Sequence, residues 1–442
     1  MPLTFTGIPE YWYSILKGLD MLRLWLPPVL LLTCFSLSAS NPEYWTADGW
    51  EVEEVARMSI RDHVSPFDSP HMETFSCVID ISGSPEPTWS VALAGDRELV
   101  YITEQGATEY FVDDCCFPIL PELSDEYVLI APQLEGRYLA RLSLADGEIT
   151  TIETDHPRTD IENWSPGFRC LMGKDGSVYF LSYDGYIGGY SSLTGNVGQE
   201  ITDGARRFRI GSHSVAEDGS IYAVLVGRYF EDGGDDAVIG YSLEEGILWE
   251  TRLHNTPPYG WLSPMDVSSD GGRIAVDRKN GGLLILDGRT GQIEENCLEE
   301  SAVRTLSLSP NGRYAAVGYA DQAWDEYLAC IDVELHEILS RVAYSEYDLE
   351  RHFAIQHVAA DGTYLGEDRA RTTGTSSRFY VINRFGECLW RTTRIRSSIK
   401  IVNSPYSNSN SETAFCKTDS GYLLVYVDIE SGDVVILNLN NR

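Results

Sequence analysis

Residues 270–291 read DGGRIAVDRKNGGLLILDGRTG and hold one complete copy of the pattern that decides the fold. A polar Asp-Gly turn opens the copy, and apolar segments follow at 273–276 and 282–287. Thr290-Gly291 then closes it with a second glycine-containing turn. Glycine in such turns supplies the positive backbone torsion that tight antiparallel connections need. The stretch therefore predicts antiparallel strands joined by short loops.

The same pattern recurs along the chain with a spacing typical of a β-propeller. Its opening turns start, 41 to 58 residues apart, at Asp175, Asp218, Asp270, Asn311, Asp361 and Asp419. Less regular copies lie at 95–102 and 136–147. A period of about 40 to 50 residues with several short strands indicates propeller blades, whose apolar faces are buried only against neighbouring blades. We predict an all-β propeller of four-stranded antiparallel blades over 75–442. Seven blades are expected, with eight as the alternative, because the copies before residue 150 are crowded and irregular.

Three segments of the chain resemble known propeller repeats. Residues 309–318 (SPNGRYAAVG) look like a WD40-like inner strand, and the Leu-Trp endings of 246–249 and 386–390 are similar to quinone-type blades. Over about residues 75–440 the chain thus resembles the broad class of propellers with WD40-like, YVTN-like or pyrroloquinoline-quinone-like (PQQ-like) repeats. Such a resemblance implies the fold far more strongly than any activity.

A propeller ring needs a strand that joins its two ends. Residues 75–81 alternate in polarity like a strand, and we expect them to pair beside the last strand, around 434–437. Residues 41–74 are expected to form a linker or a short helix, because the apolar residues after Asp48 suggest a capped helix over 48–58.

The first 40 residues are typical of an N-terminal extension followed by a secretory signal peptide. The apolar run 22–37 contains a single basic residue, Arg23, and is interrupted by paired prolines. Small residues at Ser38 and Ser40 suit a signal peptidase, so cleavage is predicted after Ser40. The run is short for a transmembrane helix, and no membrane span is expected after cleavage. The predicted location is secreted or periplasmic.

Two alternatives for this leader stay open. A start at Met21 would give the signal a conventional basic region. Residues 31–34 (LLTC) resemble a bacterial lipobox, in which Cys34 would be acylated, although Thr33 departs from that pattern. Lipid anchoring through Cys34 is therefore the alternative location.

The charge of the chain restricts its partners. It carries 67 acidic against 33 basic residues, which gives a formal net charge of −34 and a pI near 4.5. An excess of this size repels phosphate backbones, so no nucleic-acid partner is expected. With 43% hydrophobic residues the composition is that of a folded globular protein, and the acidic surface should attract cationic partners.

One loop is a candidate calcium site. Residues 231–236 (EDGGDD) bring four carboxylates together with two glycines, and Asp232, Asp235 and Asp236 are the candidate ligands. Calcium takes six to eight oxygens on an adaptable backbone, but the loop lacks the EF-hand spacing. A solvated acidic loop is the alternative, so no cofactor is assigned beyond this calcium ion.

The adjacent pair Cys115-Cys116 is the unusual covalent feature of the sequence. A disulfide between these neighbours would resemble the ring beside the cofactor in quinone-dependent alcohol dehydrogenases, whereas free or separately paired thiols are the alternative. His352 and His357 are five residues apart in a predicted strand, which places them on opposite faces and disfavours a catalytic pair. No catalytic residue is assigned, since familiar hydrolase, nucleotide-binding and zinc motifs do not occur.

These observations predict an exported, monomeric, non-catalytic propeller that presents loops to a protein, a peptide or a glycan. An enzyme at the channel mouth, such as a quinone-dependent dehydrogenase, is the first alternative. A lipoprotein of envelope assembly is the second.

Overall fold

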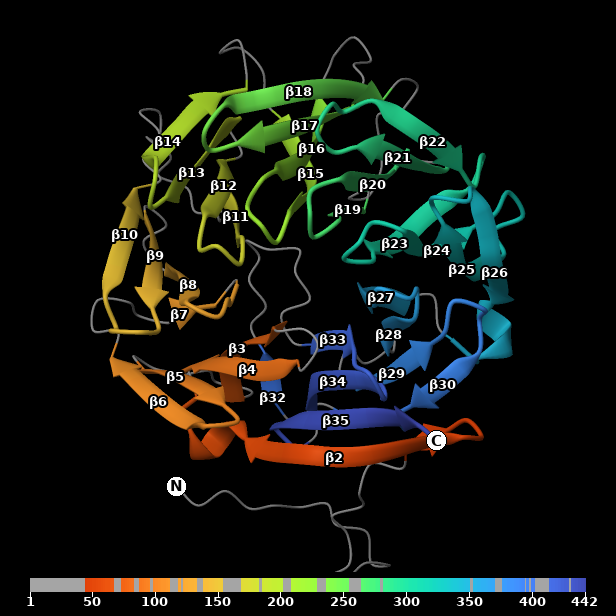
Figure 1. The fold of residues 1–442 in the computed structure, drawn as a ribbon, viewed down its shortest axis with the longest axis horizontal. Helices are drawn as coiled ribbons and strands as arrows, with labels where there is room; N and C mark the ends of the chain where they lie inside the picture. The colour runs from red at the N-terminus through yellow and green to blue at the C-terminus, as the bar shows by residue number, and fades with distance from the viewer. Residues whose placement is uncertain are drawn as a thin grey trace, which may run out of the picture. The chain divides into compact units, whose positions relative to one another are not determined.

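The propeller is built from short antiparallel sheets arranged around a central axis (Figure 1). The computed structural model describes residues 44–66, 73–82, 87–95, 98–111, 118–120, 122–132, 138–153, 168–182, 185–201, 208–228, 236–253, 264–278, 281–349, 353–369, 376–393, 395–396, 399–401, 413–428 and 431–442. These residues form eight sheets, each with four antiparallel strands that follow one another from the axis to the rim. The predicted propeller is confirmed, with eight blades, the alternative count.

The blades follow the chain order. Blade 1 contains β3 (Glu73–Ser82), β4 (Thr88–Ala94), β5 (Glu98–Thr103) and β6 (Gly106–Phe111), and β32 (Ile399–Ile401) pairs with β3 in parallel. Blade 2 contains β7 (Pro118–Ile119), β8 (Tyr127–Pro132), β9 (Tyr138–Ser143) and β10 (Ile149–Glu153). Blade 3 contains β11 (Phe168–Met172), β12 (Val178–Ser182), β13 (Tyr186–Ser191) and β14 (Gly195–Glu200). Blade 4 contains β15 (Phe208–Val215), β16 (Tyr222–Arg228), β17 (Asp236–Ser242) and β18 (Gly246–Leu253).

The second half of the ring is built in the same way. Blade 5 contains β19 (Met265–Val267), β20 (Arg273–Asp277), β21 (Leu283–Asp287) and β22 (Ile293–Cys297). Blade 6 contains β23 (Ala302–Leu308), β24 (Tyr314–Ala320), β25 (Glu326–Asp332) and β26 (Glu337–Ala343). Blade 7 contains β27 (Phe353–Val358), β28 (Tyr364–Arg369), β29 (Ser376–Ile382) and β30 (Cys388–Arg391), extended by β1 (Trp45–Thr46) and β31 (Ile395–Arg396). Blade 8 contains β33 (Thr413–Lys417), β34 (Gly421–Asp428), β35 (Asp433–Asn441) and β2 (Trp50–Ser59).

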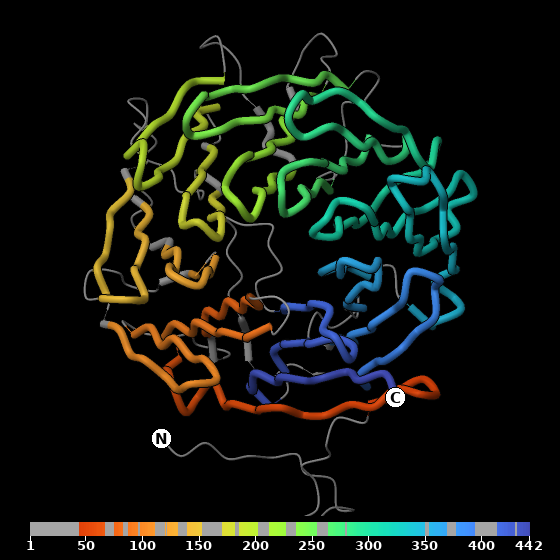
Figure 2. The backbone as a smooth tube through the Cα atoms, in the orientation of Figure 1, coloured from red at the N-terminus to blue at the C-terminus, as the bar shows by residue number. Residues whose placement is uncertain are grey.

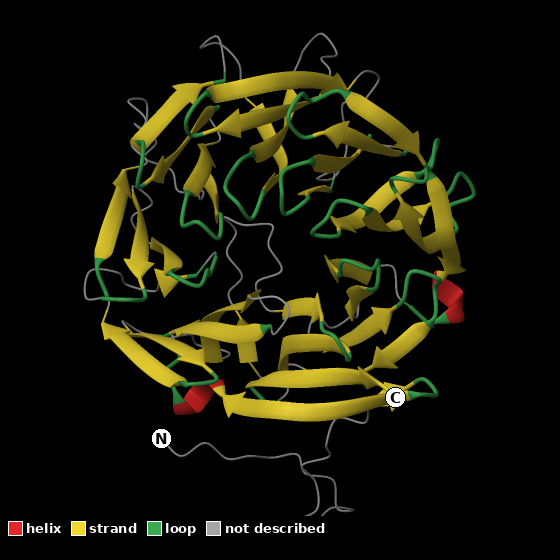
Figure 3. Cartoon of the chain, in the orientation of Figure 1, coloured by secondary structure: helices red, strands yellow, loops and turns green. Residues whose placement is uncertain are grey.

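Helix is nearly missing from the part of the chain that the structure describes. Two single turns of 3-10 helix occur there, η1 (Ile60–Asp62) and η2 (Tyr344–Glu346), and strands and turns make up the rest (Figure 3). No helix among the described residues has the length and apolar character needed to cross a lipid bilayer.

The core consists of separate apolar layers between the blades. Eight clusters of buried side chains occur in the described residues, one between each pair of neighbouring blades. Between blades 3 and 4, for example, the rings of Tyr179 and Tyr222 pack with centroids 5.2 Å apart. The layer between blades 8 and 1 joins Val425 to Phe75 and so completes the circle. Because every blade buries both faces against its neighbours, the ring is the smallest unit that removes all of these faces from water.

Strand β2 closes the ring. It forms the outermost strand of blade 8 and runs beside β35 (Figure 2). The pairing extends from Trp50 opposite Asn441 to Ser59 opposite Asp433. The helix expected over 48–58 is therefore wrong, since these residues contribute to a strand. The predicted closure by residues 75–81 is wrong as well, because they belong to β3, the inner strand of blade 1.

Candidate functional site

The repeated turns gather at one end of the propeller. In each blade the first turn joins the inner strand to the second, and the antiparallel order places all of these turns at the same end. We call this end the turn face. The side chain at the Asp or Asn position accepts backbone hydrogen bonds from residues two further on: Asp175 from Ser177, Asp270 from Gly272 and Asn311 from Arg313. Such contacts fix the turns independently of any ligand.

The turns are also tied to the blades beside them. The carbonyl of Gly176 accepts from Arg141 of blade 2 at 2.8 Å, and the carbonyl of Gly312 accepts from Arg273 of blade 5 at 3.2 Å. Glycine is required in these turns: Gly219 has a φ of +67°, and an added Cβ would collide with the Asp175 carboxylate of blade 3. The turn face is therefore a connected rim and not a set of independent loops.

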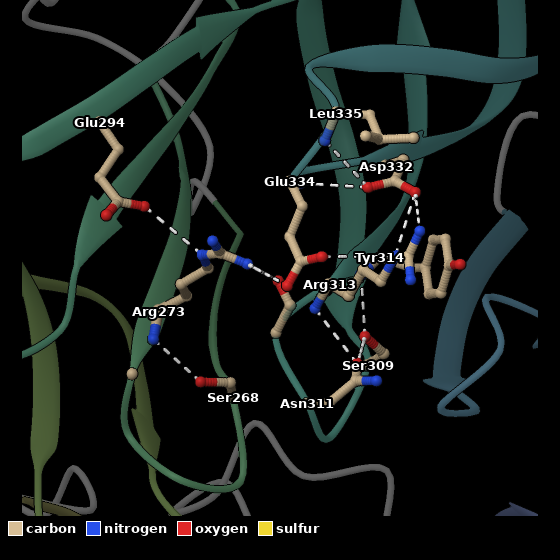
Figure 4. A network of polar contacts seen from close by, with 12 residues as sticks. Ser268, Arg273, Glu294, Ser309, Asn311, Arg313, Tyr314, Asp332, Glu334 and Leu335 are labelled. Carbon is tan, nitrogen blue, oxygen red and sulfur yellow. Dashed lines mark hydrogen bonds and ion pairs between the residues drawn. The ribbon is translucent and has the colours of Figure 1, made fainter.

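Figure 4 shows this arrangement on blades 5 and 6. The Arg313 guanidinium donates two hydrogen bonds, of 3.0 and 3.1 Å, to one oxygen of the buried carboxylate of Asp332. The other oxygen of Asp332 accepts the backbone N–H groups of Glu334 and Leu335, both at 3.1 Å. Arg273 lies between blades and pairs with Glu294 at 3.4 Å. These charges are satisfied within the fold, so we assign them a structural role.

A cavity of about 350 Å³ follows the propeller axis and is the candidate binding site. Its wall is formed by the inner strand, or the segment that follows it, of all eight blades. The charged residues of this wall, within the described residues, are Asp80, Glu122, Lys174, Glu217 and Asp266, and His213 and His357 also line it. Cavities of this size accommodate small molecules or single side chains of a partner.

Asp266 connects three blades in the cavity wall. One carboxylate oxygen accepts from the Ser214 hydroxyl of blade 4 at 3.0 Å and from the Val267 amide at 2.9 Å. The other accepts from the Ser307 hydroxyl and the Leu308 amide of blade 6, at 3.0 and 2.9 Å. Burial raises the pKa of Asp266, against the opposing effect of these hydrogen bonds. By accepting four hydrogen bonds, this carboxylate links the inner strands of three blades.

His357 connects blades 7 and 8 in the same wall. Its Nε2 lies 2.8 Å from the carbonyl oxygen of Thr413 and 3.0 Å from the hydroxyl of that residue. Burial lowers the pKa of His357 to about 4, so the imidazole is neutral at neutral pH. A neutral ring that donates to a backbone carbonyl is a structural link between the two blades.

A cation lies between carboxylates at the mouth of the cavity on the turn face. Lys174 Nζ is 3.7 Å from the Asp80 carboxylate and 3.5 Å from the Glu217 carboxylate. Burial raises the pKa of Asp80 to about 6, although the charge of Lys174 opposes this effect. For Lys174, burial lowers the pKa, but Asp80 and Glu217 outweigh it and the pKa is raised. Lys174 is therefore a charged ammonium group at neutral pH, held by carboxylates that are partly shielded from water.

Most of the residues predicted as sites lie outside the described residues. This holds for Asp232, Asp235, Cys115, Cys116, His352, Cys34 and Ser40. Asp236 begins β17 and is buried. No group of three metal-ligating side chains occurs among the residues that the structure describes. The predicted calcium site and the predicted disulfide thus stay predictions.

The residues of the mouth were missed by reasoning from motifs. Lys174 and Glu217 stand directly before the turn residues Asp175 and Asp218, and Ser269 and Pro310, which hold the same place in later copies, also line the cavity. In these repeats the residue directly before the turn Asp or Asn therefore predicts a position that lines the cavity. Asp80 carries no such signal, because the first turn of blade 1 lacks the Asp-Gly pattern.

Comparison with known proteins gives no family. No protein-family model matches the chain, and no curated protein matches it. Similar solved structures include KlHsv2 with loop 6CD replaced by a Gly-Ser linker, at 11% identity and a TM-score of 0.39 over 79% of this chain and 93% of that one. Kluyvelomyces marxianus Hsv2 gives 11% identity and a TM-score of 0.42 over 73% and 99%. A chain of a mitotic checkpoint complex gives 10% and 0.43 over 71% and 83%. The propeller assignment rests on the eight sheets and eight apolar layers described above.

Proposed function

We propose that this protein is a non-catalytic binding scaffold whose turn face receives a cationic segment of a protein or peptide partner. The observation that carries the proposal is the charge of the axial cavity, where four carboxylates face one lysine among the described residues. A low-dielectric cavity with charge of one sign concentrates the field and attracts the opposite charge. The net charge of −34 favours the same class of partner at long range.

Two features support a scaffold that binds without chemistry. The polar side chains of the cavity wall, such as Asp266 and His357, are engaged in contacts between blades. The turn rim is fixed by its own hydrogen bonds, so a partner would meet a preorganised surface and lose little of its binding energy to ordering. As part of the same proposal, the leader over residues 1–40 directs export, with lipid anchoring through Cys34 as the alternative.

Binding of short peptides tests the proposal. Labelled Gly-Ser peptides that carry lysine, arginine or glutamine at the same positions are titrated with the protein and followed by fluorescence anisotropy. The two cationic peptides should bind and the glutamine peptide should not. Affinity should fall with added salt, because screening weakens exposed charge pairs.

A matched pair of variants separates the cavity from general charge attraction. Glu122→Gln with Glu217→Gln removes two negative charges from the cavity wall. Glu53→Gln with Glu109→Gln removes two from the exposed outer strands β2 and β6. Only the first pair should weaken binding strongly, by about fivefold or more. Equal loss in both pairs would show that the attraction is non-specific and would refute the proposed site.

A further inference from the structure

Lys174 lies across the mouth of the cavity instead of pairing within its own blade. It belongs to the first turn of blade 3, yet its ammonium group reaches the Asp80 carboxylate and, at 3.3 Å, the carbonyl oxygen of Ile81, both in blade 1. Blade 2 stands between these blades in the ring. On its other side the same ammonium group faces Glu217 of blade 4. One side chain therefore connects three blades over the opening.

The contacts of this lysine with the two carboxylates are long. Nζ is 3.7 Å from Asp80 Oδ1 and 3.5 Å from Glu217 Oε2, whereas charge-assisted N–H···O bonds are about 2.7 to 2.9 Å long. The second oxygen of Asp80, Oδ2, is shielded from solvent and has no hydrogen-bond partner among the described residues. A shielded carboxylate oxygen without a donor costs free energy, so this site favours a cation that brings more donors.

We propose that Lys174 is an internal competitor that occupies the cation site of the cavity mouth until a basic side chain of the partner displaces it. This inference rests on the proposed function and names its ligand group. An arginine guanidinium satisfies the site better than a lysine, because its fork can donate to both oxygens of Asp80 at once. Displaced Lys174, which is about one third exposed, swings outward into water.

Two lysines on the turn face allow a matched test with the same peptides. Lys417 of blade 8 also pairs with a turn carboxylate, Asp361, at 2.7 Å, but it does not line the cavity. Lys174→Met should strengthen binding of the arginine peptide by about fivefold relative to Lys417→Met, because the competitor is gone while the net charge changes equally. Adding Asp80→Asn to Lys174→Met should abolish this gain.

A labelling experiment on the unmodified chain tests displacement directly. An amine-reactive acetylating reagent is applied with and without the arginine peptide, and modification of each lysine is read by mass spectrometry. Acetylation of Lys174 should rise when the peptide is bound, while that of Lys417 stays constant. Equal affinity of the two methionine variants, or unchanged labelling of Lys174, would overturn the inference. If the arginine peptide still bound through Glu122 and Glu217 in that case, the proposed function would stand, and only the inference about Lys174 would fail.

Discussion

The Asp80→Asn variant is expected to be more stable than the unmodified protein at neutral pH, although it removes an ion-pair partner of Lys174. The pKa of Asp80 is raised from 3.8 to about 6 by burial, and the favourable charge of Lys174 is already included in this value. A difference of this size corresponds to about 3 kcal/mol of unfolding free energy. The side chain is only 14% exposed, so solvent screening reduces this figure little.

The sign of the pH dependence follows from the direction of the pKa change. The folded protein holds the Asp80 proton more tightly than the unfolded chain, so the free energy of unfolding falls as the pH rises from about 4 to about 6. Above that range the cost of the buried charge is complete. Asparagine cannot ionise, and the variant avoids the cost. Its advantage should be about 3 kcal/mol near pH 8 and about half of that near pH 5.

Urea unfolding followed by tryptophan fluorescence at both pH values measures this difference. Asp419→Asn, on the exposed turn between β33 and β34, controls for the loss of one negative charge from an acidic protein. A variant that is less stable than the unmodified protein at both pH values would refute the reasoning. So would a gain that does not change with pH, because the effect would then not arise from ionisation of Asp80.

Three further predictions concern the ring itself. Val52→Asp in β2 should lower the melting temperature by several degrees, because Val52 packs against the layer between blades 7 and 8. Val55→Asp, at a 45% exposed position of the same strand, should change the melting temperature little. Equal effects of the two substitutions would contradict the role of β2 in closure. Asp266→Ala should lower the free energy of unfolding in urea by about 2 to 4 kcal/mol, because it leaves hydrogen-bond donors from three blades without an acceptor. A loss below about 0.5 kcal/mol would show that this carboxylate does not stabilise the contacts between blades. The pKa of His357 is lowered to about 4, so on acidification this histidine is protonated in the unfolded chain before it is protonated in the folded protein, and stability should fall as the pH drops from about 6.5 toward 4. In His357→Gln this part of the pH dependence should disappear. An unchanged pH profile in the variant would assign the effect to other groups.

The strands can be predicted from the sequence wherever local chemistry specifies the turns that join them. The Asp-Gly and Asn-Gly turns of blades 3 to 7 stand where the repeat placed them, because glycine is the residue that adopts the positive φ of these turns without strain. Blades 1 and 2 are less clearly marked in the sequence. Their first turns lack the Asp-Gly signal, and the inner strand β7 of blade 2 has only two residues. Eight blades emerged only from the pairing of the strands.

The error at β2 has a clear physical origin. Val52, Val55 and Met58 are three residues apart, a spacing that resembles one face of a helix. In the structure a register shift lies between Glu54 and Ala56 where β2 pairs with β35, which interrupts the two-residue alternation of a strand. The bulge exists because of the partner strand, and nothing local to residues 50–59 reveals it.

The sequence by itself determined the repeated antiparallel strands, the turns that join them and the strongly acidic character of the protein. These properties depend on residues close together in the chain. Only the tertiary structure decided the number of blades, the strand that closes the ring and the meeting of Asp80, Lys174 and Glu217 at the cavity mouth. Those features depend on contacts between distant residues, and they form only when every blade has found a neighbour on both faces.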